Sequence, residues 1–220
     1  MTVIPVSEVR RYLGIRDAGD QCEDEALSAL IQETADEMQN RCEPRHVYKT
    51  MPLSFQDGFP VIADEVIPSK DLSRNLSGCA EVILLAATAG AECDRIIRRA
   101  ECLSMAKAAV AQAAGAALIE AYADEINAQL REQAQQRGLY ARPRYSPGYG
   151  DLSLEMQKLF ARELSMQKSV GISLTESLLM IPSKSVTALI GLGKDMPCIR
   201  RTGCEACARR EDCAYGRSQK

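Results

Sequence analysis

The sequence has no tryptophan, only three phenylalanines and a single histidine among its 220 residues. A metal site built from several histidines is therefore excluded, because zinc and related sites of that kind need two or more imidazoles. A Ser-His or Cys-His catalytic pair of the usual kind is limited to the surroundings of His46. These absences remove many of the catalytic and metal sites that depend on histidine.

Long apolar runs and a strong net charge are also absent. No stretch reaches the roughly 18 apolar residues of a membrane-spanning helix. Residues 1–14, MTVIPVSEVRRYLG, lack the basic region and the apolar core of a signal peptide. The formal net charge of −3 is too small to indicate nucleic acid or a membrane as the main partner. We expect a cytoplasmic protein that binds neither.

Helical and strand patterns are mixed along the chain. Apolar spacing and strand propensity predict helices at 7–15, 24–42, 91–101, 104–138 and 152–165, and strands at 46–55, 80–88 and, as a pair, within 171–193. Ser7 is the expected N-cap of the first helix, Gly138 the expected C′ residue of the long one, and Pro182–Ser183–Lys184 the turn of the strand pair. The order does not follow a βαβ alternation, which favours an α+β fold with a mixed or antiparallel sheet packed against long helices.

The segment ARPRYSPGYG, residues 141–150, is dense in residues that shape turns and bind anions. Pro147-Gly148 is the favoured central pair of a type II turn, which accounts for the proline and the glycine. A turn alone does not account for Arg142, Arg144 and the flanking tyrosines. An arginine fork binds a carboxylate with two parallel hydrogen bonds, so we expect recognition of an amino-acid-like ligand here.

Two linked motifs in this region resemble the activation domain of cobalamin-dependent methionine synthase. The first is RYSPGYG at residues 144–150, and the second is LTESLLMIPSKSV at residues 174–186. The matching residues are Arg144, Pro147, Gly148, Tyr149, Leu174, Thr175, Glu176, Ser177, Met180, Pro182, Ser185 and Val186. Residues 81–99 and 118–126 are similar to the strand-helix unit and the long helix of that family. The resemblance covers roughly residues 78–193.

The resemblance implies an α+β activation domain that binds S-adenosylmethionine. It places the ligand's carboxylate on Arg144, with backbone groups of Pro147, Gly148 and Tyr149 helping to seat the ligand. It also places Glu120 near the ligand, whereas exposure statistics for glutamate favour a solvated residue at the edge of a helix.

The sequence departs from the family pattern at several points. GDLSL follows Tyr149 in place of a Pro-x-Cys-Pro stretch, and the N-terminal Asp-Trp segment of the family is absent. The cobalamin signature Asp-x-His-x-x-Gly is absent as well, because His46 lies in PRHVYK. The resemblance therefore implies that cobalamin is held by a partner, either a separate cobalamin-dependent methionine synthase or another corrinoid protein.

Four of the nine cysteines cluster near the C-terminus as C-x5-C-x2-C-x5-C, at Cys198, Cys204, Cys207 and Cys213. Four thiolates at this spacing suit a [4Fe–4S] cluster. Zinc is the second alternative, although zinc ribbons usually have two C-x2-C knuckles. Thiols that bind no metal are the third. We expect an α+β domain at residues 1–194 and a cysteine-rich tail at 195–220.

Two functions remain open at the level of sequence. The first is a component of methionine synthase reactivation, in which S-adenosylmethionine remethylates inactive cob(II)alamin. This reaction needs one electron from a donor protein. The cysteine tail would relay that electron if it holds iron and sulfur. The second is a non-enzymatic module that senses S-adenosylmethionine, or a metal-stabilised module that docks on a corrinoid protein. Only the first predicts formation of methylcobalamin.

Overall fold

The computed structural model describes residues 2–15 and 25–195. Their contacts divide into two compact units. Unit 1 contains the described residues up to Glu43 together with Ala91–Tyr122, and unit 2 contains Pro44–Gly90 together with residues 123–195. The domain boundary predicted after residue 194 lies at the end of the described residues and stays a prediction. No helix in this part of the chain is long and apolar enough to cross a membrane.

Unit 1 is helical. Its helices are α1 (Val6–Tyr12), α2 (Glu25–Arg41), α4 (Ala91–Leu103) and the first part of α5 (Met105–Gln136). Ser104 separates the last two, and its hydroxyl accepts a hydrogen bond from the Lys107 amide at 3.1 Å, as an N-cap does. The expected N-cap at Ser7 is wrong, because α1 begins one residue earlier and follows Pro5.

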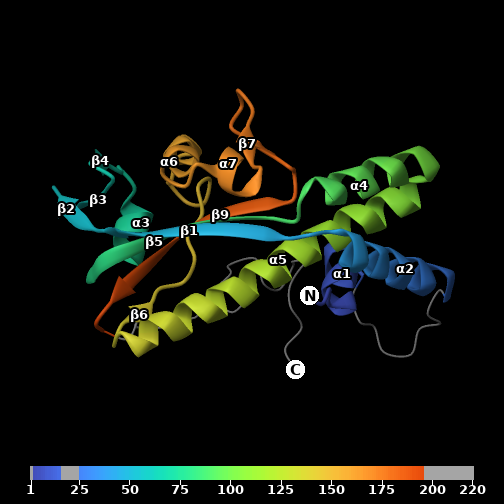
Figure 1. The fold of residues 1–220 in the computed structure, drawn as a ribbon, viewed down its shortest axis with the longest axis horizontal. Coiled ribbons are helices and arrows are strands. Elements are labelled where there is room, and N and C mark those ends of the chain that lie inside the picture. Colours follow the sequence, from blue (N-terminus) through green and yellow to red (C-terminus); the bar gives the residue numbers. More distant parts are fainter. Residues whose placement is uncertain (1, 16–24, 196–220) are drawn as a thin grey trace. The chain divides into compact units, whose positions relative to one another are not determined.

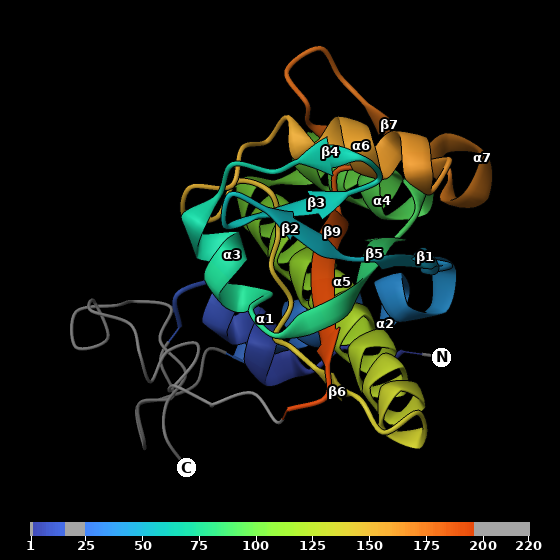
Figure 2. The same ribbon diagram turned by 90° about the vertical axis from the view of Figure 1, so that its left-hand side faces the viewer.

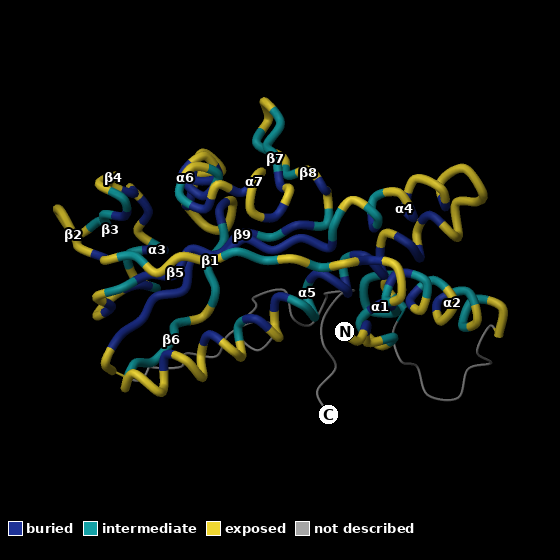
Figure 3. Tube along the Cα trace, viewed as in Figure 1, coloured by how far each residue is buried: buried dark blue, intermediate teal, exposed yellow. Residues whose placement is uncertain are grey.

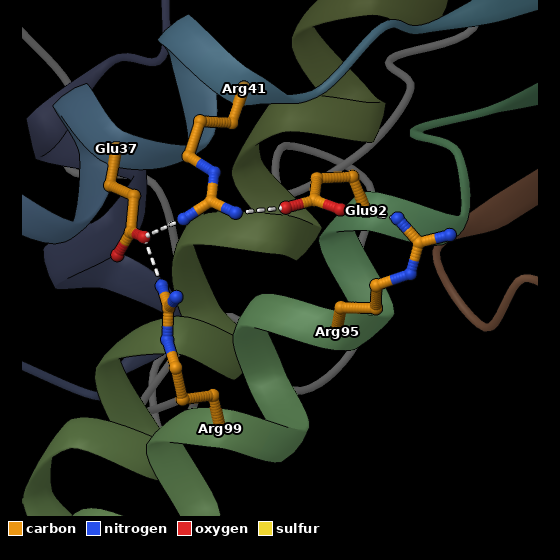
Figure 4. Close-up of polar contacts among 5 residues, drawn as sticks. All are labelled: Glu37, Arg41, Glu92, Arg95 and Arg99. Carbon is orange, nitrogen blue, oxygen red and sulfur yellow. Dashed lines mark hydrogen bonds and ion pairs between the residues drawn. The ribbon is translucent and has the colours of Figure 1, made fainter.

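Charged side chains join α2 to α4 across the surface of unit 1 (Figure 4). Arg41 donates to Glu37 at 2.9 Å and to Glu92 at 2.5 Å, and Arg99 also donates to Glu37. Arg95 adds a second contact to Glu92 at 2.5 Å. These side chains are all partly exposed, so solvent screens each pair and each contributes little to stability.

Unit 2 is built on an antiparallel sheet of order β1-β5-β9-β6 (Figures 1 and 2). The strands are β1 (Arg45–Pro52), β5 (Cys79–Thr88), β9 (Ser185–Gly193) and β6 (Tyr140–Ala141). The register pairs Leu84 with Lys49 on one side and with Leu189 on the other. The predicted α+β class with an antiparallel sheet packed against helices is confirmed.

Both faces of this sheet are covered, which explains why β5 reads as an almost continuous apolar run (Figure 3). On one face lie α6 (Met156–Glu163) and α7 (Met166–Val170), whose side chains form one core with alternate β5 residues. Phe160 is fully buried in that core. The second part of α5 lies along the other face (Figure 1), and its buried residues recur at helical spacing, at Ala123, Ile126, Leu130 and Ala134.

The end of α5 confirms the role predicted for Gly138. Its backbone has a φ of +70°, the left-handed conformation that favours glycine. The Gly138 amide donates to the Gln135 carbonyl and the Leu139 amide to the Ala134 carbonyl, both at 2.9 Å. This is the Schellman pattern, so the helix stops here and the chain turns back to the sheet.

Two of the predicted strand regions are divided in the structure. The first breaks at Leu53, after which β2 (Ser54–Gln56), β3 (Phe59–Ile62) and β4 (Glu65–Val66) form a second sheet ahead of the short helix α3 (Lys70–Asn75). The C-terminal region holds a small hairpin, β7 (Ser173–Leu174) and β8 (Met180–Ile181), and then β9. The Pro182 turn therefore connects two sheets, and the hairpin turns earlier, where the Thr175 amide donates to the Leu179 carbonyl at 2.9 Å.

Candidate functional site

The segment that carries the predicted ligand residues runs along the free side of β9 before it crosses to α6 (Figure 1, yellow). β6 pairs with the end of β9, and the Arg142 amide then donates to the Gly191 carbonyl at 2.8 Å. Further on, Tyr145 and Leu189 exchange two backbone hydrogen bonds at 2.8 and 2.9 Å. The sheet edge therefore holds the start of the loop in a defined register.

An extra residue in this pairing separates the two arginines. From Arg142 to Tyr145 the loop advances three residues, while β9 advances two, from Gly191 to Leu189. An extra residue in one strand acts as a bulge and re-aims the side chains near it. Pro143 lies within the bulge and has no amide to donate. Arg142 and Arg144 therefore have different surroundings, although the sequence presents them alike.

Arg142 is part of the sheet edge. Its Nη2 donates to the Ser77 carbonyl at 3.0 Å, and its stem passes over two glycines of β9. A Cβ added at Gly191 would lie 3.2 Å from the Arg142 Cγ, and one at Gly193 would lie 3.5 Å from its Nη2. Arg142 therefore has a structural role at the sheet edge.

Arg144 already binds a carboxylate. Its Nη2 lies 2.7 Å from Oδ1 of Asp124, an exposed residue on α5. The side chain of Arg144 is 23% exposed and that of Asp124 is 60% exposed. The guanidinium is thus held by the protein around it and remains accessible from solvent. This arrangement fits a ligand that carries a carboxylate, since a guanidinium offers five N–H donors in a fixed fork.

The turn after Arg144 has the conformation that the sequence predicts. The Tyr149 amide donates to the Ser146 carbonyl at 3.2 Å across Pro147 and Gly148. Gly148 has a φ of +88°, as the third residue of a type II turn requires. Pro147 is buried, whereas the side chain of Tyr149 is 69% exposed. The turn therefore presents Gly148 and Tyr149 to solvent on a fixed base.

The far end of the loop is anchored by Asp151. Its carboxylate accepts hydrogen bonds from the Ser69 hydroxyl, from the Lys70 amide at 2.8 Å and from the Asp71 amide at 3.2 Å. These donors lie at the start of α3, and the hydrogen bond from Ser69, followed by those from the amides, lowers the pKa of Asp151. The carboxylate thus ties the loop to a segment some 80 residues earlier in the chain.

Gly150 is confined by the same anchor. It has a φ of +53°, and a Cβ added there would lie 2.2 Å from the Asp71 Oδ2 and 2.5 Å from the Tyr145 hydroxyl. That hydroxyl donates to the Tyr149 carbonyl at 3.3 Å. Burial, followed by the negative charge of Asp71 and of Asp151, raises the pKa of Tyr145. Glycine at this position allows the turn, the tyrosine and α3 to approach closely.

Glu120, the fifth predicted ligand residue, lies on the part of α5 that belongs to unit 1. It is partly exposed, and its negative charge, after burial, contributes to the raised pKa of Tyr12. Arg144, Pro147, Gly148 and Tyr149 belong to unit 2. The role of Glu120 at the ligand therefore stays a prediction.

Two acidic residues of the site were not predicted from the sequence. Asp124 follows Glu120 by four residues, so it shares a helix face with it, and this spacing was the available signal. Asp151 lies two residues after the turn, but its partners lie far away in the sequence. A cavity of about 440 Å³ is lined by Asp151 and by apolar and charged residues of α6 and of the segment before α3; Arg144 and the turn are not among its lining residues.

The predicted metal ligands Cys198, Cys204, Cys207 and Cys213 lie outside the described residues. Within the described ranges, no cluster of three or more histidine, cysteine or acidic side chains could hold a metal ion. The cysteines in these ranges form no disulfide with one another; Cys42, Cys79 and Cys93 are buried and Cys102 is exposed. A hydrogen bond with Cys93 lowers the pKa of Cys42, whereas burial raises the pKa of Cys79.

Comparison with known proteins finds a family that matches the part of the chain containing this loop. Residues 62–196, more than half of the chain, match the family described as vitamin B12-dependent methionine synthase, activation domain. Among solved structures, the chain is similar to the MetH reactivation domain bound to AdoHcy, with a TM-score of 0.63 and 17% sequence identity. The similarity covers 96% of this chain and 84% of that one. No curated protein sequence matches.

Proposed function

Because this chain belongs to the family of vitamin B12-dependent methionine synthase activation domains, we propose that it binds S-adenosylmethionine and takes part in remethylating the inactive cob(II)alamin of a separate methionine synthase. When bound, S-adenosylmethionine supplies a methyl group activated by its sulfonium. The protein supplies binding and orientation of that group.

The observation that carries the proposal is the contact between Arg144 and Asp124. A guanidinium that binds a carboxylate at 2.7 Å while still accessible to solvent has the geometry that the α-carboxylate of the ligand needs. The type II turn beside it leaves Gly148 and the ring of Tyr149 exposed to solvent. We assign the ligand's carboxylate to Arg144 and the seating of the ligand to Pro147, Gly148 and Tyr149, with Glu120 as a further ligand residue.

Calorimetric titration with S-adenosylmethionine and with S-adenosylhomocysteine tests the assignment. Arg144→Ala should weaken binding of both by about 2–5 kcal/mol, the usual cost of removing one partner of a desolvated charge pair. Loss of the contact with Asp124 should cost at most about 1 kcal/mol of stability, because that pair is on the surface.

Arg131→Ala is the matched control, since it removes the same charge from an exposed position on α5. It should leave the affinity unchanged. A folded Arg144→Ala variant with the dissociation constants of the wild type would contradict the proposed site.

The reaction also needs one electron. We propose that Cys198, Cys204, Cys207 and Cys213 bind an iron–sulfur cluster that accepts this electron from a donor protein, supported by their spacing alone. Protein purified without oxygen should contain about four irons per chain, and serine at any of the four positions should lower that content. Colourless protein with one zinc per chain would contradict the cluster.

The proposed reactivation and a purely sensing or docking role predict different products. Purified protein, S-adenosylmethionine, a reductant and oxidised methionine synthase should together form methylcobalamin, which has a characteristic absorption spectrum. Binding of S-adenosylmethionine without methylcobalamin would favour the sensing role. Because the sequence lacks the cobalamin signature, this chain alone should copurify without a stoichiometric corrinoid.

A further inference from the structure

Asp124 directly contacts Arg144, the proposed ligand residue. It lies on α5, where the next turns are fixed against the sheet by the buried Ile126, Leu130 and Ala134. Asp124 itself is on the exposed side of the helix. The helix therefore holds its carboxylate in a defined place, with the charge facing solvent.

The hydrogen bonds of Asp124 leave part of its carboxylate available. Oδ1 accepts from Arg144 at 2.7 Å, and no residue of the described ranges donates to Oδ2. With 60% of the side chain exposed, a ligand can approach Oδ2 while the contact to Arg144 remains. An ionised carboxylate accepts up to about four hydrogen bonds, so one carboxylate can serve both a guanidinium and an ammonium group.

The pair presents a positive and a negative group side by side. The head group of an α-amino acid also carries an ammonium and a carboxylate on neighbouring atoms, so the two arrangements are complementary in charge. A carboxylate ligand without the ammonium would place its negative charge near that of Asp124, which disfavours it. Asp124 is thus suited to select amino-acid head groups over simple carboxylates.

We propose that Asp124 is a specificity-determining residue that accepts hydrogen bonds from the α-ammonium group of the ligand while Arg144 binds its α-carboxylate. This inference rests on the proposed function, because it concerns the same site. It deepens that proposal by naming the ligand class, zwitterionic amino acids with a nucleoside substituent, and the residue that distinguishes them from their deaminated analogues.

The test is a set of binding measurements with two ligands and three proteins. The ligands are S-adenosylhomocysteine and its deaminated analogue, in which hydrogen replaces the α-ammonium group. The proteins are the wild type, Asp124→Asn and the control Glu132→Gln. Glu132 is exposed on the same helix, about 12 Å further along, so its variant makes the same change in charge away from the site.

Asp124→Asn should weaken binding of S-adenosylhomocysteine by about 10- to 100-fold, the effect of losing one charge-assisted hydrogen bond. It should leave binding of the deaminated analogue unchanged or make it tighter. Glu132→Gln should bind both ligands as the wild type does. Circular dichroism spectra should establish that each variant is folded, and Asp124→Ala provides a second variant with the same expected pattern.

Two results would overturn the inference while leaving the proposed function in place. Tighter binding of S-adenosylhomocysteine by Asp124→Asn would show that Asp124 competes with the ligand's carboxylate for Arg144. If Asp124→Asn weakened the binding of both ligands equally, or changed the binding of neither, Asp124 would not bind the ammonium group. Failure of the wild-type protein to bind S-adenosylhomocysteine at all would overturn the proposed function, and the inference with it.

Discussion

Replacement of Gly150 by alanine should destabilise unit 2 through two separable effects. The first is conformational, because the backbone of residue 150 has a φ of +53°, and an L-residue in the left-handed region costs about 1–2 kcal/mol. The second is steric, because the new methyl group would lie 2.2 Å from the Asp71 Oδ2 and 2.5 Å from the Tyr145 hydroxyl. Both of those atoms are at the ends of side chains and can move away.

Their movement should break the hydrogen bond from Tyr145 to the Tyr149 carbonyl, which is worth about 1 kcal/mol. The total expected loss for Gly150→Ala is therefore about 2–3 kcal/mol in the free energy of unfolding. Gly138→Ala is the matched control. Gly138 also has a positive φ, of +70°, but a Cβ there would meet no atom within 4 Å. The Gly138→Ala variant should show only the conformational loss in the free energy of unfolding, about 1–2 kcal/mol.

Urea denaturation followed by circular dichroism measures both free energies, since the chain has no tryptophan for fluorescence. The Gly150 variant should unfold at a lower urea concentration than the Gly138 variant, with an unchanged slope. Equal losses for the two variants would refute the reasoning, because they would mean that the close approach of Tyr145 and Asp71 to Gly150 contributes nothing.

Two other predictions concern stability. Phe160→Ala should lower the free energy of unfolding of unit 2 by about 3–5 kcal/mol in the same urea assay, because the ring is fully buried between the sheet and the other core residues; a loss under about 1 kcal/mol would contradict this packing. The anchor at Asp151 should depend on pH. Its folded-state pKa lies below the unfolded value of about 3.9, so the stabilisation is present above that pH and is lost as pH falls through the folded-state pKa. In acid titrations of the urea midpoint, Asp151→Asn should show a weaker decline than the wild type below about pH 4, and identical declines would exclude this carboxylate as a contributor.

Patterns within short segments predicted much of the fold correctly. The apolar run at residues 80–88, the long helix ending at Gly138 and the turn at Pro147-Gly148 all appear in the structure. In each case the interactions that decide the conformation lie within a few residues: helical hydrogen bonds, a positive φ at glycine, or β-branched side chains in a strand. Local sequence therefore contains the information needed.

The same local reasoning failed where one segment serves two sheets. Residues 46–55 and 171–193 have the composition of continuous strands, yet the chain leaves one sheet for another at Leu53 and again at Pro182. The side-chain pattern indicates that a residue is extended and half buried. It does not indicate which neighbouring strand forms the residue's backbone hydrogen bonds. The change from one partner strand to another therefore cannot be predicted from the sequence.

The candidate site combines both kinds of information. Residue types alone pointed to a carboxylate-binding arginine beside a rigid turn, because guanidinium chemistry and turn propensity belong to the residues themselves. Tertiary structure gave Arg142 and Arg144 different surroundings, since the register against β9 leaves one extra residue between them. It also brought Asp124 to Arg144 across 20 residues and Asp151 to Ser69 across 82. Such pairs depend on how helices and strands pack, and that packing is determined by the whole core rather than by any one segment.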